Sequence, residues 1–574
     1  VRLYDLFEKY KFLPQSRLQT ITPFIVLFVL IIPAFADALR VGYFPMHDDL
    51  QTMRHLVMDK CFMDLQIPCR WSQDLGYGFG YPLFNFYPPL PYYFGQVIHW
   101  LGFQFVDTVK VLIVLNFLVS GLTMYLLAKE FWGKVGGIIS SVLYVYAPYH
   151  AVDIYVRAAI NEAWALAFFP GVFWAIYKII ETSKWFYVPF LALFVAFLML
   201  SHNPILMIFA PFAISWALFW LIVTRKVRDL IKLFVGGFWA LGLAAFFTLP
   251  VLFETKYVHV ETLVSGYFNY LAHFATVGQL FISRDWGFGD SRFGPVDDIS
   301  FQIGHIHWIL AISSLAIALL IYKKNLKLYT MIILIFTATL AYTFMAHQRS
   351  SPIWLAIPAL QYLQFPWRFL TLSIFGTSFL AGSIMIFLSK IRSQRLLALL
   401  VFSFILFSIV FYKDYFRWRD YWPWVNDQHK FSGELWRLQI TSGIFDYLPK
   451  WVPLPPPFPP NGDAEMVSGD GEIKTLFKNS IKQRYYVNIL KDGVFQINTF
   501  YFPGWKYFVD GNEIEINPYD DKEVGRPRIS LNQGQHMVIA RFTNTPIRSL
   551  GNSLSLVSLT FLIIIFVKAF ARRV

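Results

Sequence analysis

Two adjacent carboxylates, Asp48 and Asp49, follow His47 shortly after the first long apolar stretch of the chain. A carboxylate that is partly removed from water has a raised pKa and can act as a general base, taking a proton from an attacking hydroxyl group. The alternative is that both acids are simply solvated at a helix end. The pattern makes Asp48 and Asp49 candidates for catalysis and leaves open which of the two is the base.

Two arginines at the ends of other apolar stretches suit the binding of a phosphate group. Arg157 precedes Glu162 by five residues, and Arg368 follows Gln364. Arginine binds phosphate oxygens through charge-assisted hydrogen bonds, and the free N–H groups of a helix N-terminus strengthen such a site. The alternatives are an anchoring arginine with a helix-capping acid in the first case, and an arginine that extends to the membrane interface beside Trp367 in the second.

Three histidines, His47, His55 and His202, complete the set of candidate substrate-binding residues. A lone histidine in a polar turn, such as His202, more often hydrogen-bonds within the turn than binds a ligand. Together with Asp48 and Asp49, the histidines are also of the types that hold a divalent metal ion, but no compact ligand spacing such as HExxH occurs. No cofactor is therefore certain, and a divalent metal ion stays an open alternative.

The chain has two cysteines, Cys61 and Cys69, eight residues apart. In an oxidising compartment such a pair can form a disulfide that closes its loop. Because spacing alone does not establish the geometry, two free thiols are the alternative.

The elements that must position these residues lie in a lipid bilayer. Hydrophobic residues make up 56% of the chain and charged residues 15%, and the mean hydropathy is +0.49, so polar surface is too scarce to cover a large soluble globule. Crossing ~30 Å of hydrocarbon takes about 20 apolar residues. Such runs occur about twelve times, near 20–39, 107–128, 135–149, 161–180, 186–201, 205–224, 232–253, 305–322, 328–346, 368–389, 396–412 and 550–570. We expect a mainly α-helical, polytopic membrane protein.

The basic residues predict its orientation, because Lys and Arg in short loops stay on the cytoplasmic side. Every second connection is short and basic, and both chain ends are basic; these residues are Arg2, Lys9, Lys11, Arg17, Lys129, Lys134, Lys178, Lys184, Arg225, Lys226, Arg228, Lys232, Lys323, Lys324, Lys327, Lys390, Arg392, Arg395, Arg572 and Arg573. Both termini are therefore predicted to be cytoplasmic in the cell membrane, with the candidate site outside. The net charge of +13 follows largely from this pattern and calls for no nucleic-acid partner.

The chain divides into three predicted parts: a transmembrane domain at 1–412 with a large first outer loop at 40–106, an extracytoplasmic β-rich domain at 413–548, and a final transmembrane helix with a basic cytoplasmic tail at 549–574. Short alternating segments at 484–490, 493–500, 505–509, 512–516, 526–531 and 535–542 are separated by turn residues and predict a small β-sandwich. The loop at 254–304 is predicted to cover the substrate.

The order of several motifs resembles a known family. These are His47-Asp-Asp, Gly80-Tyr-Pro-Leu-Phe-Asn-Phe-Tyr-Pro-Pro, Arg157 to Glu162, Ser201-His-Asn-Pro, Gln364-Phe-Pro-Trp-Arg and, near the end, Tyr501-Phe-Pro-Gly-Trp-Lys-Tyr-Phe-Val-Asp-Gly. Over nearly the whole chain they resemble the bacterial membrane family labelled 6-pyruvoyl-tetrahydropterin synthase-related, which is YfhO-like. No zinc-enzyme motif accompanies that label, so no pterin chemistry is expected.

The resemblance implies a GT-C-like fold, that of integral-membrane glycosyltransferases that use sugars linked to a polyprenyl phosphate. It implies Asp48, with Asp49 beside it, as the base in the first outer loop, and Glu162 as the acid of the second. Arg157 and Arg368 are expected to contact phosphate because of their position and charge.

The expected reaction is an inverting transfer of a sugar from this lipid-linked donor to an extracytoplasmic acceptor, which is a cell-envelope glycan, a lipid or a protein. Since phosphate leaves without a general acid, one base and cations on the leaving group suffice. The alternatives are a non-catalytic transporter or flippase for lipid-linked glycans, and a scaffold for envelope assembly. Intramembrane acids and an inverted repeat would favour transport, but no convincing repeat is present.

Overall fold

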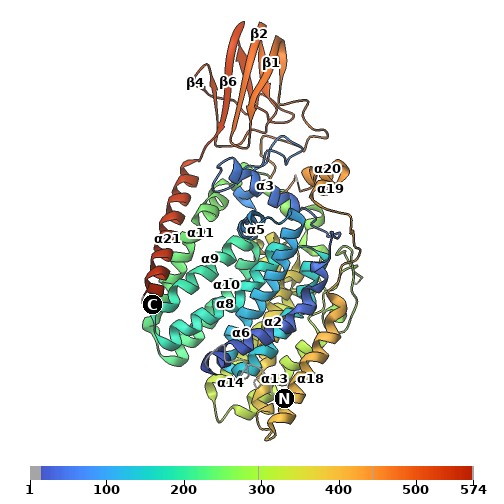
Figure 1. The fold of residues 1–574 in the computed structure, drawn as a ribbon, viewed down its shortest axis with the longest axis vertical. Coiled ribbons are helices and arrows are strands. Elements are labelled where there is room, and N and C mark those ends of the chain that lie inside the picture. The colour runs from blue at the N-terminus through green and yellow to red at the C-terminus, as the bar shows by residue number, and fades with distance from the viewer. Residues whose placement is uncertain (1–14, 295, 444, 572–574) are drawn as a thin grey trace.

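The computed structural model describes residues 15–294, 296–443 and 445–571. A bundle of long helices carries an upright antiparallel sheet at one end (Figure 1). Five of the basic residues used to predict the orientation, Arg2, Lys9, Lys11, Arg572 and Arg573, lie outside the described residues.

All twelve apolar runs are helical. Within the described residues, nine helical stretches are long and apolar enough to cross a membrane, and two shorter apolar helices span Trp185–Ser201 and His305–Ile321. The helices are α2 (Gln15–Phe35), α6 (Phe105–Val145), α8 (Ile160–Thr182), α9 (Val188–Ser201), α10 (Asn203–Thr224), α11 (Leu230–Glu254), α13 (His305–Ile321), α14 (Leu326–Met345), α16 (Leu370–Ala381), α17 (Met385–Leu388), α18 (Gln394–Tyr412) and α21 (Pro546–Ala571). The predicted polytopic helical fold is confirmed.

Helix α6 contains two of the predicted runs, because the chain reverses within it. Gly133 has φ 72° and ψ 177°, a conformation that a residue with a side chain rarely adopts. After this turn the second half packs back on the first, so that a Cβ at Gly137 would lie 3.0 Å from the ring of Tyr125. The basic residues Lys129 and Lys134 flank the turn, as the charge pattern predicted for a short connection.

The centre of the bundle is formed by α8 and by the stretch Pro366–Leu388. They are the most buried of the candidate spans, with 83% and 89% of their apolar windows buried. Both begin with candidate site residues, since Glu162 lies in the first turn of α8 and Arg368 lies three residues into the second stretch. The two most buried of the candidate spans therefore position these two side chains.

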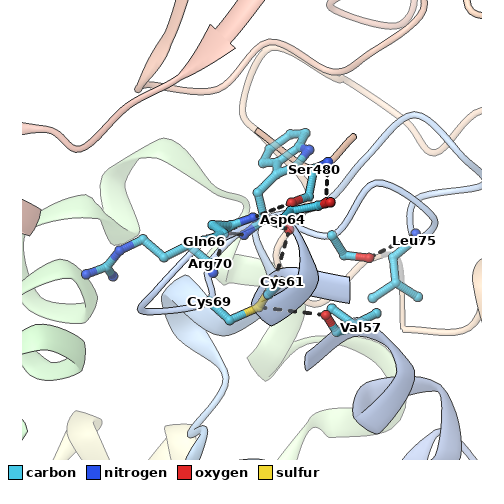
Figure 2. Close-up of a disulfide and its surroundings, with 10 residues drawn as sticks. Val57, Cys61, Asp64, Gln66, Cys69, Arg70, Leu75 and Ser480 are labelled. Atoms are coloured by element: carbon cyan, nitrogen blue, oxygen red, sulfur yellow. Dashed lines mark hydrogen bonds between the residues drawn. A yellow bond between two sulfur atoms is a disulfide. The ribbon is translucent and has the colours of Figure 1, made fainter. Parts of the chain in front are cut away.

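The loop after the first helix folds into three short helices, α3 (Gln51–Met63), α4 (Leu83–Phe86) and α5 (Leu90–Trp100). Cys61 and Cys69 form a disulfide beneath the sheet (Figure 2). Gly80 has φ 89°, and a Cβ there would lie 2.4 Å from the ring of Trp71, so only glycine fits at this position. This packing explains why the loop motif Gly80-Tyr-Pro-Leu-Phe-Asn-Phe-Tyr-Pro-Pro begins with a glycine.

The β-rich domain contains β1 (Ala464–Lys478), β2 (Lys482–Ile497), β3 (Trp505–Val509), β4 (Asn512–Ile514), β5 (Arg528–Leu531) and β6 (Gly534–Phe542). The strands are hydrogen-bonded in the order β1-β2-β6-β3-β4, and β5 also pairs with β2. The two predicted segments 484–490 and 493–500 largely form the single strand β2. Strand β1 was not predicted; its side chains are mostly exposed, and its middle contains Gly469 and Gly471.

Strand β2 folds back on itself and so produces the two layers of the predicted sandwich. The rings of Tyr485 and Phe495 lie 5.5 Å apart although ten residues separate them, a distance of about 33 Å in a straight strand. Strand β6 pairs with 482–489 and β5 with 493–496, so the two halves of β2 belong to different layers. Buried side chains from both halves share one apolar core.

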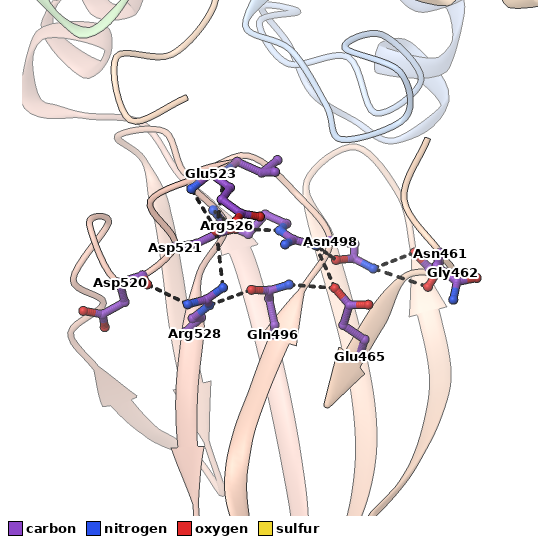
Figure 3. A network of polar contacts seen from close by, with 11 residues as sticks. Asn461, Gly462, Glu465, Gln496, Asn498, Asp520, Asp521, Glu523, Arg526 and Arg528 are labelled. Atoms are coloured by element: carbon purple, nitrogen blue, oxygen red, sulfur yellow. Dashed lines mark hydrogen bonds and ion pairs between the residues drawn. The ribbon is translucent and has the colours of Figure 1, made fainter. Parts of the chain in front are cut away.

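The sheet domain is fixed to the bundle by polar contacts on two sides. Ser480, in the turn between β1 and β2, donates its backbone N–H to Asp64 and accepts from Gln66, 2.8 and 2.9 Å away, next to the disulfide (Figure 2). On the other side, the buried Glu254 at the end of α11 accepts from Arg548 Nε at 2.9 Å in the first turns of α21. A separate network inside the domain holds the loop before β5 through Asp521 and Arg526 (Figure 3).

Candidate functional site

A cavity of about 890 Å³ lies at the end of the bundle that carries the sheet. Eight of the nine residues predicted from the sequence line it: His47, Asp48, Asp49, Arg157, Glu162, His202, Gln364 and Arg368. These residues come from four separate parts of the chain. The fold therefore collects into one chamber side chains that the sequence shows only as scattered motifs.

The segment that carries the two acids is fixed by backbone hydrogen bonds. His47 and Asp48 donate their N–H groups to the carbonyl oxygens of Val156 and Arg157, over 3.0 and 3.1 Å. The backbone of the acids thus lies directly against that of Arg157. A cation site and an acid site are held side by side without any side chain having to bridge them.

Asp48 faces the cavity with one carboxylate oxygen free. Its Oδ2 accepts from Arg54 Nη1 at 2.6 Å and from Gln51 Nε2 at 3.2 Å. No residue that the structure describes hydrogen-bonds to Oδ1, and the side chain keeps a third of its surface exposed. A carboxylate held at one oxygen and open at the other is oriented to accept a proton.

Asp49 is held more tightly. Its Oδ2 lies 2.6 Å from Nζ of Lys430, whose side chain is 1% exposed. Its Oδ1 is buried and has no hydrogen-bond partner among the described residues. Burial raises the pKa of Asp49 to about 6, while the Lys430 ammonium opposes the rise. Lys430 ends α19 (Asp427–Lys430), so a segment far along the chain completes this part of the cavity wall.

Both carboxylate oxygens of Glu162 are occupied by neighbouring side chains. Its Oε2 lies 3.0 Å from Arg157 Nη2 and 3.2 Å from Arg368 Nε, and its Oε1 accepts from the Tyr149 hydroxyl at 2.7 Å. The side chain of Glu162 is 1% exposed. Glu162 thus holds two arginines together at the cavity wall and has no free oxygen to offer to a substrate.

The two arginines are fixed further by other groups. Arg157 also pairs with Asp153 and lies over the ring of Trp367, 4.4 Å from its centroid. Arg368 donates to Oε1 of Gln364, which in turn donates to the carbonyl of Leu263 at 3.0 Å. Leu263 belongs to the loop predicted to cover the substrate, and that loop lines the cavity through Leu263 and other residues.

The three histidines lie in different surroundings. Nδ1 of His202 accepts from the backbone N–H of Ile205 and so caps α10, and burial with the nearby Arg368 lowers the pKa of His202 to about 3. His47 packs against the ring of Phe288, and burial lowers its pKa. His55 does not line the cavity: it is buried against Tyr92, and burial lowers its pKa to about 3.

Sequence reasoning gave no site role to several residues that line the cavity. These include Arg54, Lys430, Asp446 and Asp290. Asp446 follows α20 (Gly433–Thr441), in a segment predicted to belong to the sheet domain, and burial raises its pKa to about 6. No motif pointed to Lys430 or Asp446, because nothing in their neighbours along the chain differs from an ordinary polar loop.

The described residues contain no group of three or more His, Cys, Asp or Glu side chains placed to hold a metal ion. Where the sequence suggested such a set, Asp48 and Asp49 instead face Arg54 and Lys430.

Comparison with known proteins identifies a family. A family model described as a 6-pyruvoyl-tetrahydropterin synthase related domain, membrane protein, matches residues 84–416, more than half of the chain. A protein of Lactococcus lactis subsp. cremoris (strain MG1363), named only as uncharacterized, is 27% identical over 239 residues. The match covers 39% of this chain and 36% of that relative's length.

Two solved structures share part of the arrangement. The mycobacterial arabinofuranosyltransferase AftD is 14% identical with a TM-score of 0.43, over 72% of this chain and 28% of that one. The Archaeoglobus fulgidus oligosaccharyltransferase, in its apo form, is 12% identical with a TM-score of 0.40, over 71% and 57%. Identities this low and TM-scores below 0.5 say nothing about the activity of this chain.

Proposed function

This chain belongs to the 6-pyruvoyl-tetrahydropterin synthase related family of membrane proteins, and within that family we propose that it is a glycosyltransferase that takes a sugar from a polyprenyl-phosphate donor. The acceptor lies outside the cytoplasm and belongs to the cell envelope. The protein works as a multi-pass protein of the cell membrane with both termini in the cytoplasm.

One observation carries the proposal: a carboxylate with a free oxygen and a pair of arginines line the same large cavity. Asp48 supplies the carboxylate, and Arg157 with Arg368 supply the cations. A volume of about 890 Å³ is enough for a sugar and the head of its lipid. A base and cations in one cavity are what transfer of a glycosyl group from a phosphate requires.

The reaction is a single displacement. Oδ1 of Asp48 takes the proton of an acceptor hydroxyl as its oxygen bonds to the anomeric carbon. The bond from that carbon to the phosphate oxygen breaks, and its electron pair leaves with polyprenyl phosphate. Arg157 and Arg368 stabilise the negative charge that develops on this oxygen, so their effect is greatest in the transition state. One displacement inverts the anomeric configuration.

Two predicted catalytic residues receive other roles in this proposal. Glu162 is a positioning residue, since all its contacts serve to hold Arg157, Arg368 and Tyr149. Asp49 is not the base, because its only unpaired oxygen is buried and cannot reach a substrate in this structure. Of the predicted substrate-binding residues, Arg157 and Arg368 contact the phosphate, and Gln364 supports Arg368.

The test is to purify the protein with Asp48→Asn and Asp49→Asn variants. Release of polyprenyl phosphate is followed from a panel of radiolabelled polyprenyl-phosphate sugars in the presence of membrane-extracted acceptors. We expect Asp48→Asn to lower turnover by about 10²–10⁴-fold, the usual contribution of a general base. Asp49→Asn should lower turnover less, and donor binding should persist in both.

If Asp48→Asn turns over the donor at the parental rate, Asp48 is not the base. If the donor binds and no sugar is transferred or released under any condition, the transferase function is wrong, and a transporter or scaffold takes its place.

A further inference from the structure

Resting on the proposed transferase, we propose that Arg54 and Asp446 form the acceptor subsite and that this subsite takes a neutral, hydroxyl-rich group, a sugar. The donor phosphate then lies at Arg157 and Arg368, which line the same cavity. The proposal goes beyond the transfer reaction because it assigns the chemical class of the acceptor.

The geometry that supports it is a small pocket that opens beside the large cavity. The pocket holds about 20 Å³, enough for a single group of the size of a water molecule or a sugar hydroxyl. It shares seven lining residues with the large cavity: Leu50, Arg54, Tyr87, Ser442, Gly443, Asp446 and Tyr447. A ring bound in the cavity can therefore extend one substituent into the pocket.

The turn that carries Asp446 is fixed by hydrogen bonds. The hydroxyl of Tyr81 donates to the carbonyl of Gly443 at 2.9 Å and accepts from the backbone N–H of Tyr447 at 2.6 Å. Tyr81 belongs to the Gly80-Tyr-Pro run of the first loop. That run therefore holds a carboxylate that lies some 360 residues away along the chain.

Donors and acceptors alternate along this wall. Asp446 lines both the pocket and the large cavity, and no described residue hydrogen-bonds to its carboxylate. Arg54 uses Nη1 for Asp48, and no described residue accepts from its other two guanidinium nitrogens. Its guanidinium also lies over the ring of Tyr87, 4.3 Å from the centroid, which fixes its plane.

The charges at this end select against anionic acceptors. Asp48 and Asp49 are each paired with a cation, Arg54 and Lys430, so the charge left over is that of Asp446, which repels a phosphate or a carboxylate. A sugar hydroxyl is both a donor and an acceptor, so neighbouring hydroxyls can bond to Arg54 and Asp446 at the same time. The side chains of Tyr87 and Tyr447 also line the pocket.

The first experiment compares the parent protein with Asp446→Asn and Asp446→Ala, using methyl glucoside, methyl mannoside and methyl galactoside as acceptors. The matched control is Glu434→Gln, which removes the same charge from the same segment, where Glu434 is exposed and pairs with Arg437. We expect KM for the methyl glycoside to rise about 10- to 100-fold in both Asp446 variants, as loss of hydrogen bonds to a charged group predicts.

The KM for the donor should stay within about twofold of the parent in these variants. If it rises together with the KM for the glycoside, Asp446 acts on the donor or on the fold, and the acceptor assignment is wrong. Thermal unfolding of each variant is compared with that of Glu434→Gln. It shows whether an effect on transfer is due to a loss of folded protein alone.

A second measurement does not depend on turnover. Binding of the same three methyl glycosides, of ethanolamine and of glycerol 3-phosphate is followed by saturation-transfer NMR with purified protein. We expect only the glycosides to bind, and Asp446→Asn to weaken them about tenfold or more. Equal binding by parent and variant, or preference for the amine or the phosphate, overturns the proposal. Glycoside binding that depends on Asp446 in a protein without turnover would refute the transferase and keep the sugar subsite.

Discussion

At the scale of single residues, the two neighbouring acids differ because they have different partners. Asp48 pairs with Arg54, six residues away, and keeps one oxygen open to the cavity. Asp49 pairs with Lys430, which is buried and 381 residues away. Asp48 is thus oriented for proton transfer, whereas Asp49 is held in the cavity wall by its ion pair.

Lys430 therefore controls the protonation of Asp49. Burial raises the pKa of Asp49 to about 6, and the ammonium of Lys430 keeps it from rising further. We expect Lys430→Met to raise that pKa by about 1–3 pH units, since an opposite charge at this distance lowers a carboxyl pKa by that amount. At pH 7 the carboxyl of Asp49 is then at least about half protonated. Carbon-13 NMR of labelled aspartate measures the titration.

Lys430→Arg is the control, since it keeps the cation and should leave the pKa of Asp49 near 6. If activity needs the charge of Asp49, the acidic limb of the pH profile should shift to higher pH in Lys430→Met and stay in place in Lys430→Arg. An unchanged titration in Lys430→Met would show that the ion pair does not exist in the protein.

Site residues could be predicted from the sequence where they lie close to one another along the chain. The Asp48-Asp49 pair, Arg157 with Glu162, and Gln364 with Arg368 each stand within a few residues of one another, and all line the cavity. Lys430 and Asp446 belong to a loop of ordinary composition, and only the folded chain brings them to the acids. His55 has the right residue type but lies on the side of α3 that packs on α5.

At the scale of elements, one buried cluster joins the last helix to the rest of the molecule. Glu254 at the end of α11 accepts from Arg548 of α21, from Thr545 just before this helix, and from Asn85 of the first loop. Helices α11 and α21 lie side by side along their length (Figure 1). The sheet domain precedes α21 directly, so this cluster also fixes the sheet.

Replacing Glu254 by Gln removes the negative charge and leaves Arg548, whose side chain is completely buried, without a counter-ion. We expect a loss of about 3–5 kcal/mol in stability, the usual effect of breaking a buried ion pair on one side. The thermal midpoint should fall, and trypsin should cut near 541–548 faster than in the parent.

Glu513→Gln is the matched control, because Glu513 pairs with Lys506 on the exposed surface of the sheet. Exposed pairs contribute about 0–1 kcal/mol, so its midpoint should hardly move. Equal midpoints for Glu254→Gln and Glu513→Gln would mean that the buried cluster does not hold α21.

The elements themselves were largely predictable, and the exceptions have physical reasons. Apolar runs of membrane length identify helices because every backbone polar group must be satisfied within lipid. Strand β1 escaped prediction because its exposed side chains and glycines remove the alternating pattern. The fold-back of β2 lies where the sequence predicts a turn, between residues 484–490 and 493–500, although both segments belong to one strand that pairs with β1.

At the scale of the whole molecule, the charge pattern makes a prediction about sidedness. The two native cysteines are joined in a disulfide, so an added cysteine is the sole free thiol for a maleimide. We expect a membrane-impermeant maleimide to label Asn512→Cys, in the sheet, on intact cells. Lys324→Cys and Arg392→Cys, in two short basic connections, should react only after the membrane is opened.

The reverse labelling would place the cavity on the cytoplasmic side. It would then also rule out an extracytoplasmic acceptor. A mass shift of each labelled protein on a gel is a sufficient readout, with the parent protein as the unlabelled control.

The pairing of Asp49 with Lys430 also sets an order of events during synthesis. A ribosome adds about 5–20 residues per second, so Lys430 emerges roughly 20–75 s after Asp49. Arg54, by contrast, reaches Asp48 almost at once. Eleven of the twelve apolar segments are made before Lys430 is, so the pair that completes this part of the cavity wall forms only after most of the membrane domain has been synthesised.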